Sequence, residues 1–236
     1  MIGILGGMGT QAGLDFCNKL TMLNRGKIDQ KYPLFILYNK SNIPGRPENL
    51  HNYNKVLKSL MAGCLLLQKN KCKFIVIPCN TAHYWYDDLQ KKIKIPIISM
   101  PKEVYLHAKN NCKKDSKIGI LATEGTLKTD VYNKFFNKKF ILINPKKSLQ
   151  IKSVNKAIKY VKMGKIKNAE KSIKPAINYL IKMKCNKIIL GCTELPIAIF
   201  AFQSFKKIKL SKIFLDPNLI LAIASMKKYK KLRLSL

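Results

Sequence analysis

Two stretches of the chain, FIVIPCNTAH at residues 74–83 and KIILGCTELP at residues 187–196, share one pattern. In each, a short apolar run rich in β-branched residues leads into a cysteine, and a threonine follows within two positions. Apolar runs without alternation are typical of strands that are covered on both faces, as in parallel sheets. Cys79 and Cys192 are therefore each expected just beyond the end of a buried strand.

The segments around these stretches repeat in the same order. The chain has IGILGGMGT at residues 2–10 and IGILATEGT at residues 118–126, and the first glycine of each precedes the cysteine of its half by 76 and 73 residues. A predicted strand that ends in proline closes each half, IPIISMP at Pro101 and KIFLDP at Pro217. Matched landmarks at similar spacing indicate an internal duplication.

Segments with helical periodicity lie between the predicted strands. Spacings of three and four place one set of apolar residues on a single stripe: Tyr53, Val56, Leu60, Cys64 and Leu67. Alternating strands and helices predict an α/β protein with two pseudo-symmetric domains, each a short parallel sheet flanked by helices. We expect the first domain to comprise residues 1–100 plus about 206–236, and the second to comprise residues 101–205.

The position of the two cysteines predicts where the chemistry takes place. In open parallel sheets, ligands bind at the carboxyl ends of the strands. Both cysteines stand at such ends, so the active site is expected in the cleft between the domains. A helix is predicted after each cysteine, and its backbone N–H groups and dipole favour the thiolate form. The remaining cysteines are interpreted as small buried hydrophobic residues: Cys17, Cys64, Cys72, Cys112 and Cys185.

Cysteine usage and hydropathy also bear on the class of protein. The chain has seven cysteines, no C-x-x-C and no paired Cys/His spacing, which argues for a reducing, cytoplasmic setting without a zinc site. The sequence opens on a strand-like apolar run without the parts of a signal peptide, and no apolar stretch reaches the roughly 18 residues of a membrane span. We expect neither secretion nor membrane insertion.

The formal charge of +33 raises the possibility of a nucleic-acid partner. However, only Arg25, Arg46 and Arg233 among the 45 basic residues are arginine, whereas phosphate and base recognition favours the arginine fork. The lysines are spread along the whole chain, which indicates a compositional bias on solvated faces. The dense basic segment at residues 227–236 is interpreted as a frayed terminus, and no specific nucleic-acid binding is expected.

The glycine-rich loop has a competing interpretation. Residues 7–12 fit the dinucleotide fingerprint G-x-G-x-x-A, with Asp29 placed 20 residues beyond Gly9. That fingerprint needs its acid at the end of the second strand, but the second strand is predicted at residues 34–38 and Asp29 precedes it. We therefore interpret the glycines as a tight loop that lets a small anionic ligand approach backbone amides.

Together these motifs resemble those of the aspartate/glutamate racemase superfamily, and the resemblance covers nearly the whole chain. Five of them follow in the expected order: GGMG at 6–9, PCNTAH at 78–83, ATEGT at 122–126, GCTE at 191–194 and DP at 216–217. Glutamate racemases typically have GCTHYP in the second cysteine loop, so GCTELP and His83 resemble the aspartate racemase branch. Thr10 and Glu124 depart from the pattern, where proline and threonine are common.

The resemblance implies a cofactor-independent amino-acid racemase that acts on aspartate, with Cys79 and Cys192 as the catalytic pair. Two opposed thiols suit this reaction, because one base must remove the Cα proton from one face while an acid delivers a proton to the other. No pyridoxal phosphate is required. Relatives commonly dimerise, so a homodimer is expected.

The resemblance also implies a set of substrate-binding residues. Donors for the α-carboxylate, where charge accumulates, match family positions at Asn80, Thr81, Thr123 and Thr193, and Met8 lies in the GGMG loop. Each threonine also suits ordinary helix capping. Arg46 and Lys162 match cations for the distal carboxylate, and Arg46 is favoured because an arginine in a lysine-rich chain suggests a need for bidentate geometry. His83 and Glu194 are candidates for tuning the thiols.

Other functions are compatible with the same residues. A glutamate racemase or a broad-specificity acidic amino-acid racemase would carry similar motifs, and a hydantoin racemase is a more distant alternative. A single cysteine would have favoured the decarboxylase relatives. From a different class, a basic nucleic-acid-binding protein that has kept the fold is the alternative, and the salt dependence of DNA affinity would distinguish it.

Overall fold

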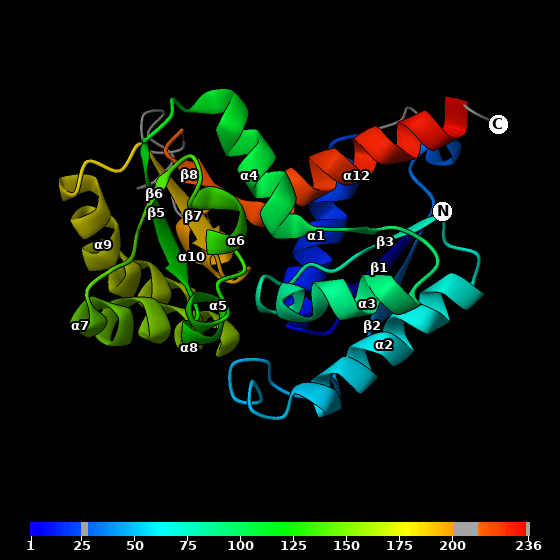
Figure 1. The fold of residues 1–236 in the computed structure, drawn as a ribbon, viewed down its shortest axis with the longest axis horizontal. Helices are drawn as coiled ribbons and strands as arrows, with labels where there is room; N and C mark the ends of the chain where they lie inside the picture. Colours follow the sequence, from blue (N-terminus) through cyan, green and yellow to red (C-terminus); the bar gives the residue numbers. More distant parts are fainter. Residues whose placement is uncertain (25–27, 201–211, 235–236) are drawn as a thin grey trace. The chain divides into compact units, whose positions relative to one another are not determined.

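The strands form two parallel four-stranded sheets with the same strand order (Figure 1). The first has the order β2-β1-β3-β4, with β1 at Ile2–Gly6, β2 at Phe35–Asn39, β3 at Phe74–Val76 and β4 at Ile97–Ile98. The second has the order β6-β5-β7-β8, with β5 at Lys117–Ala122, β6 at Ile141–Ile143, β7 at Lys187–Gly191 and β8 at Phe214–Leu215. The predicted α/β class with two short parallel sheets is confirmed in this computed structural model, which describes residues 1–24, 28–200 and 212–234.

Helices connect the strands throughout. In the first half these are α1 (Thr10–Met22), η1 (Asp29–Lys31), α2 (Tyr53–Lys69), η2 (Thr81–Trp85), α3 (Tyr86–Lys92) and α4 (Met100–Asn111). In the second half they are α5 (Glu124–Lys128), α6 (Asn133–Phe136), α7 (Lys147–Leu149), the π-helix η3 (Gln150–Asn155), α8 (Lys156–Lys162), α9 (Ile166–Lys182), α10 (Leu195–Phe200) and α12 (Pro217–Leu234).

Both faces of the first sheet are buried, as its unbroken apolar strands predict. One face, with Leu5, Ile75 and Ile77, packs against the apolar stripe of α2 and against α3. The stripe predicted from spacing is present, because Val56, Leu60, Cys64 and Leu67 are all fully buried. The opposite face packs against α1 and α12 (Figure 1).

In the second sheet, α8 and α9 cover the face that carries Leu121, Ile188 and Leu190. The sequence of α9 explains this packing, since Ile173, Ala176, Ile177 and Leu180 recur at helical spacing and are buried. Aromatic rings from α4, from α6 and from the residues just before α6 and β6 form a separate group, in which three ring pairs pack edge to face and the pair Phe136–Phe140 is tilted: Tyr105, Tyr132, Phe136 and Phe140.

Contacts between residues divide the chain into two units, Met1–Glu103 with Asn218–Leu236 and Val104–Pro217. The closing strand β8 pairs with β7, so it belongs to the second sheet. The sequence-based ranges instead gave residues from about 206 to the first domain, of which 206–211 lie outside the described residues. Within the described parts of the chain, no helix is long and apolar enough to cross a membrane.

The basic segment after residue 226 is helical up to Leu234, which corrects the interpretation of a frayed terminus. The lysines conceal an apolar stripe of Leu221, Ala222, Met226 and Tyr229, which are buried in the first unit. The hydroxyl of Tyr229 also accepts a hydrogen bond of 3.1 Å from the backbone N–H of Leu34. Burying these side chains stabilises the helix by more than the repulsion between exposed lysines destabilises it.

Candidate active site

The two cysteines occupy equivalent positions in the two sheets. The first glycine of each opening segment pairs with Ile75 in the first sheet and with Ile188 in the second. Cys79 and Cys192 each stand four residues beyond that isoleucine, past the carboxyl end of the strand. Both side chains are buried, at 5% and 6% exposed. The internal duplication therefore extends to the register of the two cysteines, which are the candidate catalytic residues.

His83 holds the backbone of the Cys79 loop. Its Nδ1 lies 2.9 Å from the carbonyl oxygen of Cys79, and its Nε2 lies 3.0 Å from the backbone nitrogen of Met100, at the start of α4. Because Nε2 must accept from that N–H, Nδ1 carries the proton and donates to Cys79. Burial lowers the pKa of His83 to about 4, so the imidazole is neutral at physiological pH. The two hydrogen bonds of this ring thus hold the loop backbone in place.

The glycine loop packs tightly against the chain that follows β2. Gly7 has φ +90°, and a Cβ there would lie 2.3 Å from the backbone of Lys40, so only glycine fits. Beyond it, the carbonyl of Met8 accepts a hydrogen bond of 2.5 Å from Nη2 of Arg46. Asp29 lies in η1 before β2, which ends at Asn39, so the acid of a dinucleotide fingerprint is absent from the strand end, as predicted.

Arg46 is the cation of this half of the candidate site. Its Nη1 lies 3.5 Å from the carbonyl of Pro44, at the limit of a hydrogen bond. Its Nε is buried and has no hydrogen-bond partner within the described residues. The guanidinium therefore anchors the Met8 loop with one N–H and keeps a buried donor available.

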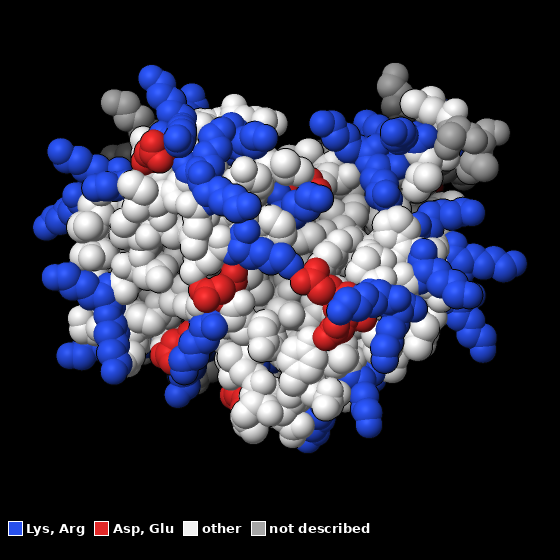
Figure 2. All heavy atoms as spheres, in the orientation of Figure 1, with Lys and Arg blue, Asp and Glu red and all other residues white. Residues whose placement is uncertain are grey.

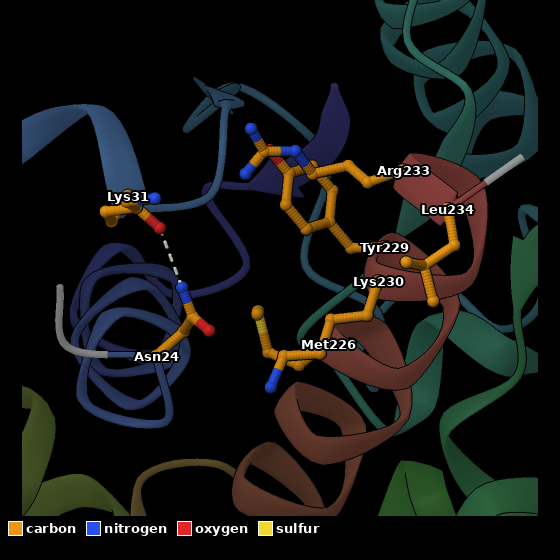
Figure 3. A pocket seen from close by; sticks show the side chains of 7 residues that line it. All are labelled: Asn24, Lys31, Met226, Tyr229, Lys230, Arg233 and Leu234. Carbon is orange, nitrogen blue, oxygen red and sulfur yellow. Dashed lines mark hydrogen bonds between the residues drawn. The ribbon is translucent and has the colours of Figure 1, made fainter. Parts of the chain in front are cut away.

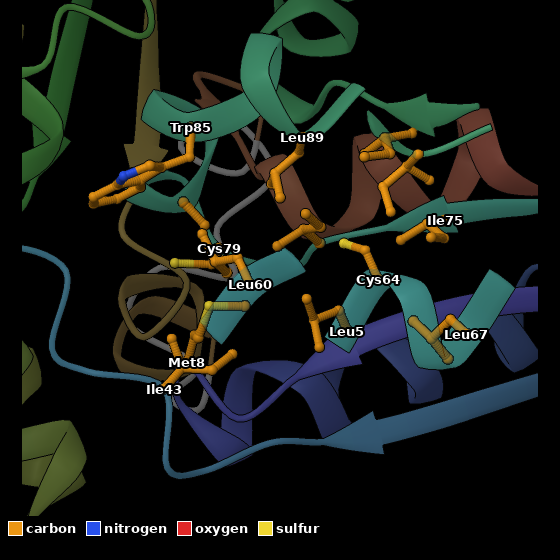
Figure 4. Close-up of a cluster of buried hydrophobic side chains, with 14 of the residues drawn as sticks. Leu5, Met8, Ile43, Leu60, Cys64, Leu67, Ile75, Cys79, Trp85 and Leu89 are labelled. Carbon is orange, nitrogen blue, oxygen red and sulfur yellow. The ribbon is translucent and has the colours of Figure 1, made fainter. Parts of the chain in front are cut away.

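The Cys79 side chain lies at one end of an apolar cluster (Figure 4). Met8, Ile43 and Trp85 are labelled beside it, whereas Leu67 and Ile75 lie at the other end. The following residues Asn80 and Thr81 are also buried, at 3% and 5% exposed, where η2 begins. The structure thus gathers the Cys79 loop, the Met8 loop and the Arg46 segment in the first unit.

In the second unit, the Cys192 thiol has a carboxylate partner. Its Sγ donates to Oε2 of Glu194 over 3.0 Å, and Thr193 Oγ1 lies 3.4 Å from the same oxygen. Burial raises the pKa of Cys192 well above its ordinary value, and the nearby charge of Glu194 raises it further. Lys162, an exposed residue at the end of α8, opposes this shift more weakly.

This finding corrects the expectation that a helix dipole favours the Cys192 thiolate. The following helix, α10, has only six residues and begins three positions later. Dipole effects fall off within the first turn and are modest. Desolvation and a carboxylate in direct contact are larger effects, so the thiol is the stable form.

Thr123 caps the helix that follows β5. Its Oγ1 accepts from the backbone N–H of Thr126 over 3.2 Å, which is the capping role that the sequence also allowed. The loop contacts η3, because the side chain of Gln150 donates to the carbonyl of Ala122 over 2.9 Å. Gln150 is not among the site residues predicted from the sequence. The sequence did carry a signal for it. Gln150 is a polar residue four positions before Val154 and eight before Ile158, so it lies on the same helical stripe as these apolar residues.

A separate hollow of about 600 Å³ lies near the end of α12 (Figure 3). It is lined by Asn24, Lys31, Met226, Tyr229, Lys230, Arg233 and Leu234. The hydrogen bond from Leu34 to Tyr229 places it beside the start of β2, at the amino edge of the first sheet. Cys79 lies at the carboxyl edge, so this hollow is not part of the candidate site.

On the face shown in Figure 2, the lysines of the described residues are not concentrated in one patch. Lys and Arg side chains are scattered over the face shown in Figure 2, over helices of both units. Glu and Asp side chains lie among them. This distribution agrees with a compositional bias and offers no continuous basic stripe on that face.

Comparisons with known proteins agree with this geometry. The model of the family described as Asp/Glu/hydantoin racemase matches residues 5–222. The chain belongs to this family. Membership makes it one of the amino-acid racemases, which are isomerases, and the two-sheet fold is that of the family's solved structures.

Individual members of the family differ in the substrate that they are named for. The Picrophilus torridus aspartate racemase is similar at 27% identity with a TM-score of 0.82, over 97% of this chain and 94% of that one. The broad specificity amino-acid racemase of Bacillus subtilis is 26% identical over 86% of this chain and 89% of its own length. The glutamate racemase of Corynebacterium diphtheriae is 26% identical over 66% of this chain, but the match spans only 57% of that enzyme.

Proposed function

We propose that the protein interconverts L- and D-aspartate by a two-base mechanism, in which Cys79 and Cys192 act on opposite faces of the substrate Cα. The observation that carries this proposal is the equivalent register of the two cysteines in sheets of equal topology. A duplicated fold that presents one thiol per half supplies the matched acid and base that inversion requires.

The resting protonation state assigns the first roles. Because burial and Glu194 keep the proton on Cys192, this residue serves first as the acid. Cys79 then acts as the base and removes the Cα proton of one enantiomer while Cys192 delivers a proton to the other face. The forward step leaves the proton on Cys79 and a thiolate at Cys192, so the reverse reaction starts from this state with Cys79 as the acid and Cys192 as the base. Where Cys192 still holds its proton, Glu194 removes it, because its carboxylate already accepts a hydrogen bond from the thiol over 3.0 Å, and solvent supplies the proton that Cys79 needs. The Cα–H bond breaks, its electron pair delocalises into the α-carboxylate, and a new Cα–H bond forms.

Charge that develops on the α-carboxylate needs donors that are already in place. We assign this task to Asn80 and Thr81 beside Cys79 and to Thr123 and Thr193 beside Cys192, with the Met8 loop close to the first pair. The distal carboxylate is assigned to Arg46, whose buried Nε has no partner in the described residues, with Lys162 as a second cation. No pyridoxal phosphate or metal takes part in these steps.

The choice of aspartate rests on Arg46 and on the similarity to the Picrophilus enzyme named aspartate racemase. A second candidate, racemisation of several amino acids, is favoured by the similarity to the Bacillus enzyme named broad specificity racemase along most of both chains. We also propose that the active form is a homodimer, which sedimentation at assay concentration would measure.

A chiral assay of the purified protein tests the proposal. The protein is dialysed against a chelator and supplied with L- and D-forms of aspartate, glutamate and alanine, without added cofactor. We expect aspartate to reach a racemic mixture fastest from either enantiomer. Comparable rates for aspartate, glutamate and alanine would support the broad-specificity candidate. Absence of turnover for every amino acid would refute the proposed function.

A further inference from the structure

Gln150, the first residue of the π-helix η3, presents a buried atom that lacks a partner. Its side chain is 6% exposed, and its Nε2 donates to the carbonyl of Ala122 over 2.9 Å and to Oδ1 of Asn155 over 2.8 Å. Both N–H groups of the amide are therefore used. Its Oε1 is buried and accepts no hydrogen bond from any residue that the structure describes. Leaving such an acceptor unpaired is costly, which calls for a donor that the described residues do not supply.

The orientation of this amide is fixed by its neighbours. Glu124, as a carboxylate, can only accept, so Asn155 donates to it through Nδ2 over 2.8 Å. Asn155 must then turn its oxygen towards Gln150. The carbonyl of Ala122 also requires a donor. With both neighbours as acceptors, Gln150 cannot exchange its nitrogen and oxygen, and Oε1 remains an acceptor.

The amide also lies at the carboxyl edge of the second sheet, beside the Cys192 loop. Ala122 pairs with Gly191 on the neighbouring strand β7, and Cys192 is the next residue. Adjacent strands lie about 4.8 Å apart, so the Gln150 amide is bound to the end of the strand next to the reacting thiol. Single-turn π-helices inside longer helices occur frequently at functional sites.

We infer that Oε1 of Gln150 accepts a hydrogen bond from the α-ammonium group of the substrate. This inference rests on the proposed function and adds the residue that recognises the amino group. An acidic amino acid at neutral pH has carboxylates that only accept and an ammonium group that only donates. A fixed acceptor at this edge therefore complements the ammonium group, as the buried Nε donor of Arg46 complements a carboxylate.

The test compares two ligands that differ in the amino group. Aspartate and succinate have the same carbon chain and both carboxylates, but succinate lacks the ammonium group. The measurements are the KM of aspartate and the inhibition constant of succinate, for wild type, Gln150→Met and Gln150→Asn. Met keeps the volume without the polar atoms, and Asn withdraws the amide by one methylene group.

We expect either substitution to raise the KM of aspartate by about 30-fold, as for a hydrogen bond to a charged group, while succinate inhibition changes by less than about threefold. Retained succinate inhibition shows that the variant is folded. Glu124→Gln is the matched control, because the amide oxygen of the introduced glutamine can still accept from Asn155. In this control, the ratio of the aspartate KM to the succinate inhibition constant should match that of the wild type.

Equal losses for both ligands would overturn the inference and would mean that Gln150 supports only the Thr123 loop. No change for either ligand would also overturn it, since a water molecule would then satisfy Oε1. If the wild type racemises glutamate instead, glutamate and glutarate replace the pair and the expectation is unchanged. A wild type that neither turns over nor binds acidic amino acids refutes the proposed function itself, which the variants alone cannot do.

Discussion

The Cys79 loop and the Cys192 loop have the same register in their sheets but different polar partners. His83, four residues after Cys79, bonds the backbone carbonyl of that cysteine and the start of α4. Glu194, two residues after Cys192, bonds the thiol itself. Duplication thus gives the two cysteines equal positions, but the neighbouring side chain bonds the loop backbone in one half and the thiol in the other.

Removal of either thiol has the largest expected effect on this pair. Cys79→Ser and Cys192→Ser should each abolish net racemisation, because serine is too weak an acid and base to replace a thiol, while circular dichroism shows an unchanged fold. Exchange of the Cα proton in heavy water should persist for one enantiomer only, and for opposite enantiomers in the two variants. Full racemase activity in either variant would eliminate the two-thiol mechanism.

Glu194→Gln tests whether the asymmetry matters for catalysis. A carboxylate that receives the Cys192 proton contributes by general base catalysis, so we expect kcat/KM to fall by about 100-fold. Since the enantiomers have equal free energies, kcat/KM must fall equally in both directions. The asymmetry should appear in Cα–H exchange, which should slow most for the enantiomer deprotonated by Cys192. Equal slowing of exchange for both enantiomers would show that Glu194 acts only on the structure of the loop.

The Cys79 half differs from the Cys192 half in its cation. Arg46 has a rigid guanidinium that a hydrogen bond to Met8 holds in place. Arg46→Lys keeps the charge but loses the fork, and we expect a cost of about 2 kcal/mol, roughly 30-fold in kcat/KM for aspartate. Arg46→Ala should cost more. Alanine, a slow test substrate without a distal carboxylate, should lose less.

Arg46 also donates to the Met8 carbonyl, so its replacement could act through the Met8 loop and not through the substrate. Equal losses of kcat/KM for aspartate and alanine would show that Arg46 only supports the Met8 loop and does not bind the distal carboxylate. Lys162→Met is the matched change in the Cys192 half. It should have a smaller effect, because Lys162 is exposed and its charge is screened by solvent.

His83 should affect stability more than chemistry. Burial lowers its pKa to about 4, against an ordinary value of 6.5, so the unfolded chain binds a proton at a higher pH than the folded chain does. Its contribution to stability is complete above pH 6.5 and is lost as the pH falls towards 4, by up to about 3 kcal/mol. In His83→Gln, the free energy of unfolding measured in urea should depend less on pH between about pH 4 and 6.5 than in the wild type.

His107→Gln provides the comparison for this measurement. His107 is exposed, and its pKa is lowered by partial burial and by Lys187. Its replacement should change the pH dependence much less. If the two variants behave alike, the hydrogen bonds of His83 do not set the pH dependence.

Both halves carry the lysine excess, and its effect on function should be the smallest. We expect DNA binding to be weak, non-specific and lost by physiological salt. A salt titration of duplex affinity by fluorescence anisotropy measures this. Tight, sequence-selective binding at about 150 mM salt would instead support the nucleic-acid alternative.

The sequence was sufficient to predict the sheets and the places of the two cysteines. Buried parallel strands such as β3 and β7 are unbroken apolar runs, and an internal repeat fixes their equivalence without tertiary information. The lysines after residue 226 misled the prediction because charge density hid an apolar stripe.

The contacts of individual side chains could not be predicted in the same way. The pKa of Cys192 depends on the 3.0 Å distance to Glu194 and on burial, which spacing in the sequence does not encode. Gln150 reaches Ala122 only because the chain from 123 to 149 folds back onto β5. The roles of the candidate residues remain predictions for the variants above.

The packing of α12 against the first sheet has a consequence for biosynthesis. The helix begins 119 residues after β4 ends (residues 98 and 217), and it covers Ile2, Ile4, Phe74 and Val76 together with α1. The ribosome therefore releases the whole second unit before the first can bury this face. An apolar surface that stays open during translation is where chaperones act and where aggregation begins. A nascent chain stopped before Pro217 should bind chaperones through its first hundred residues, although those residues were made first.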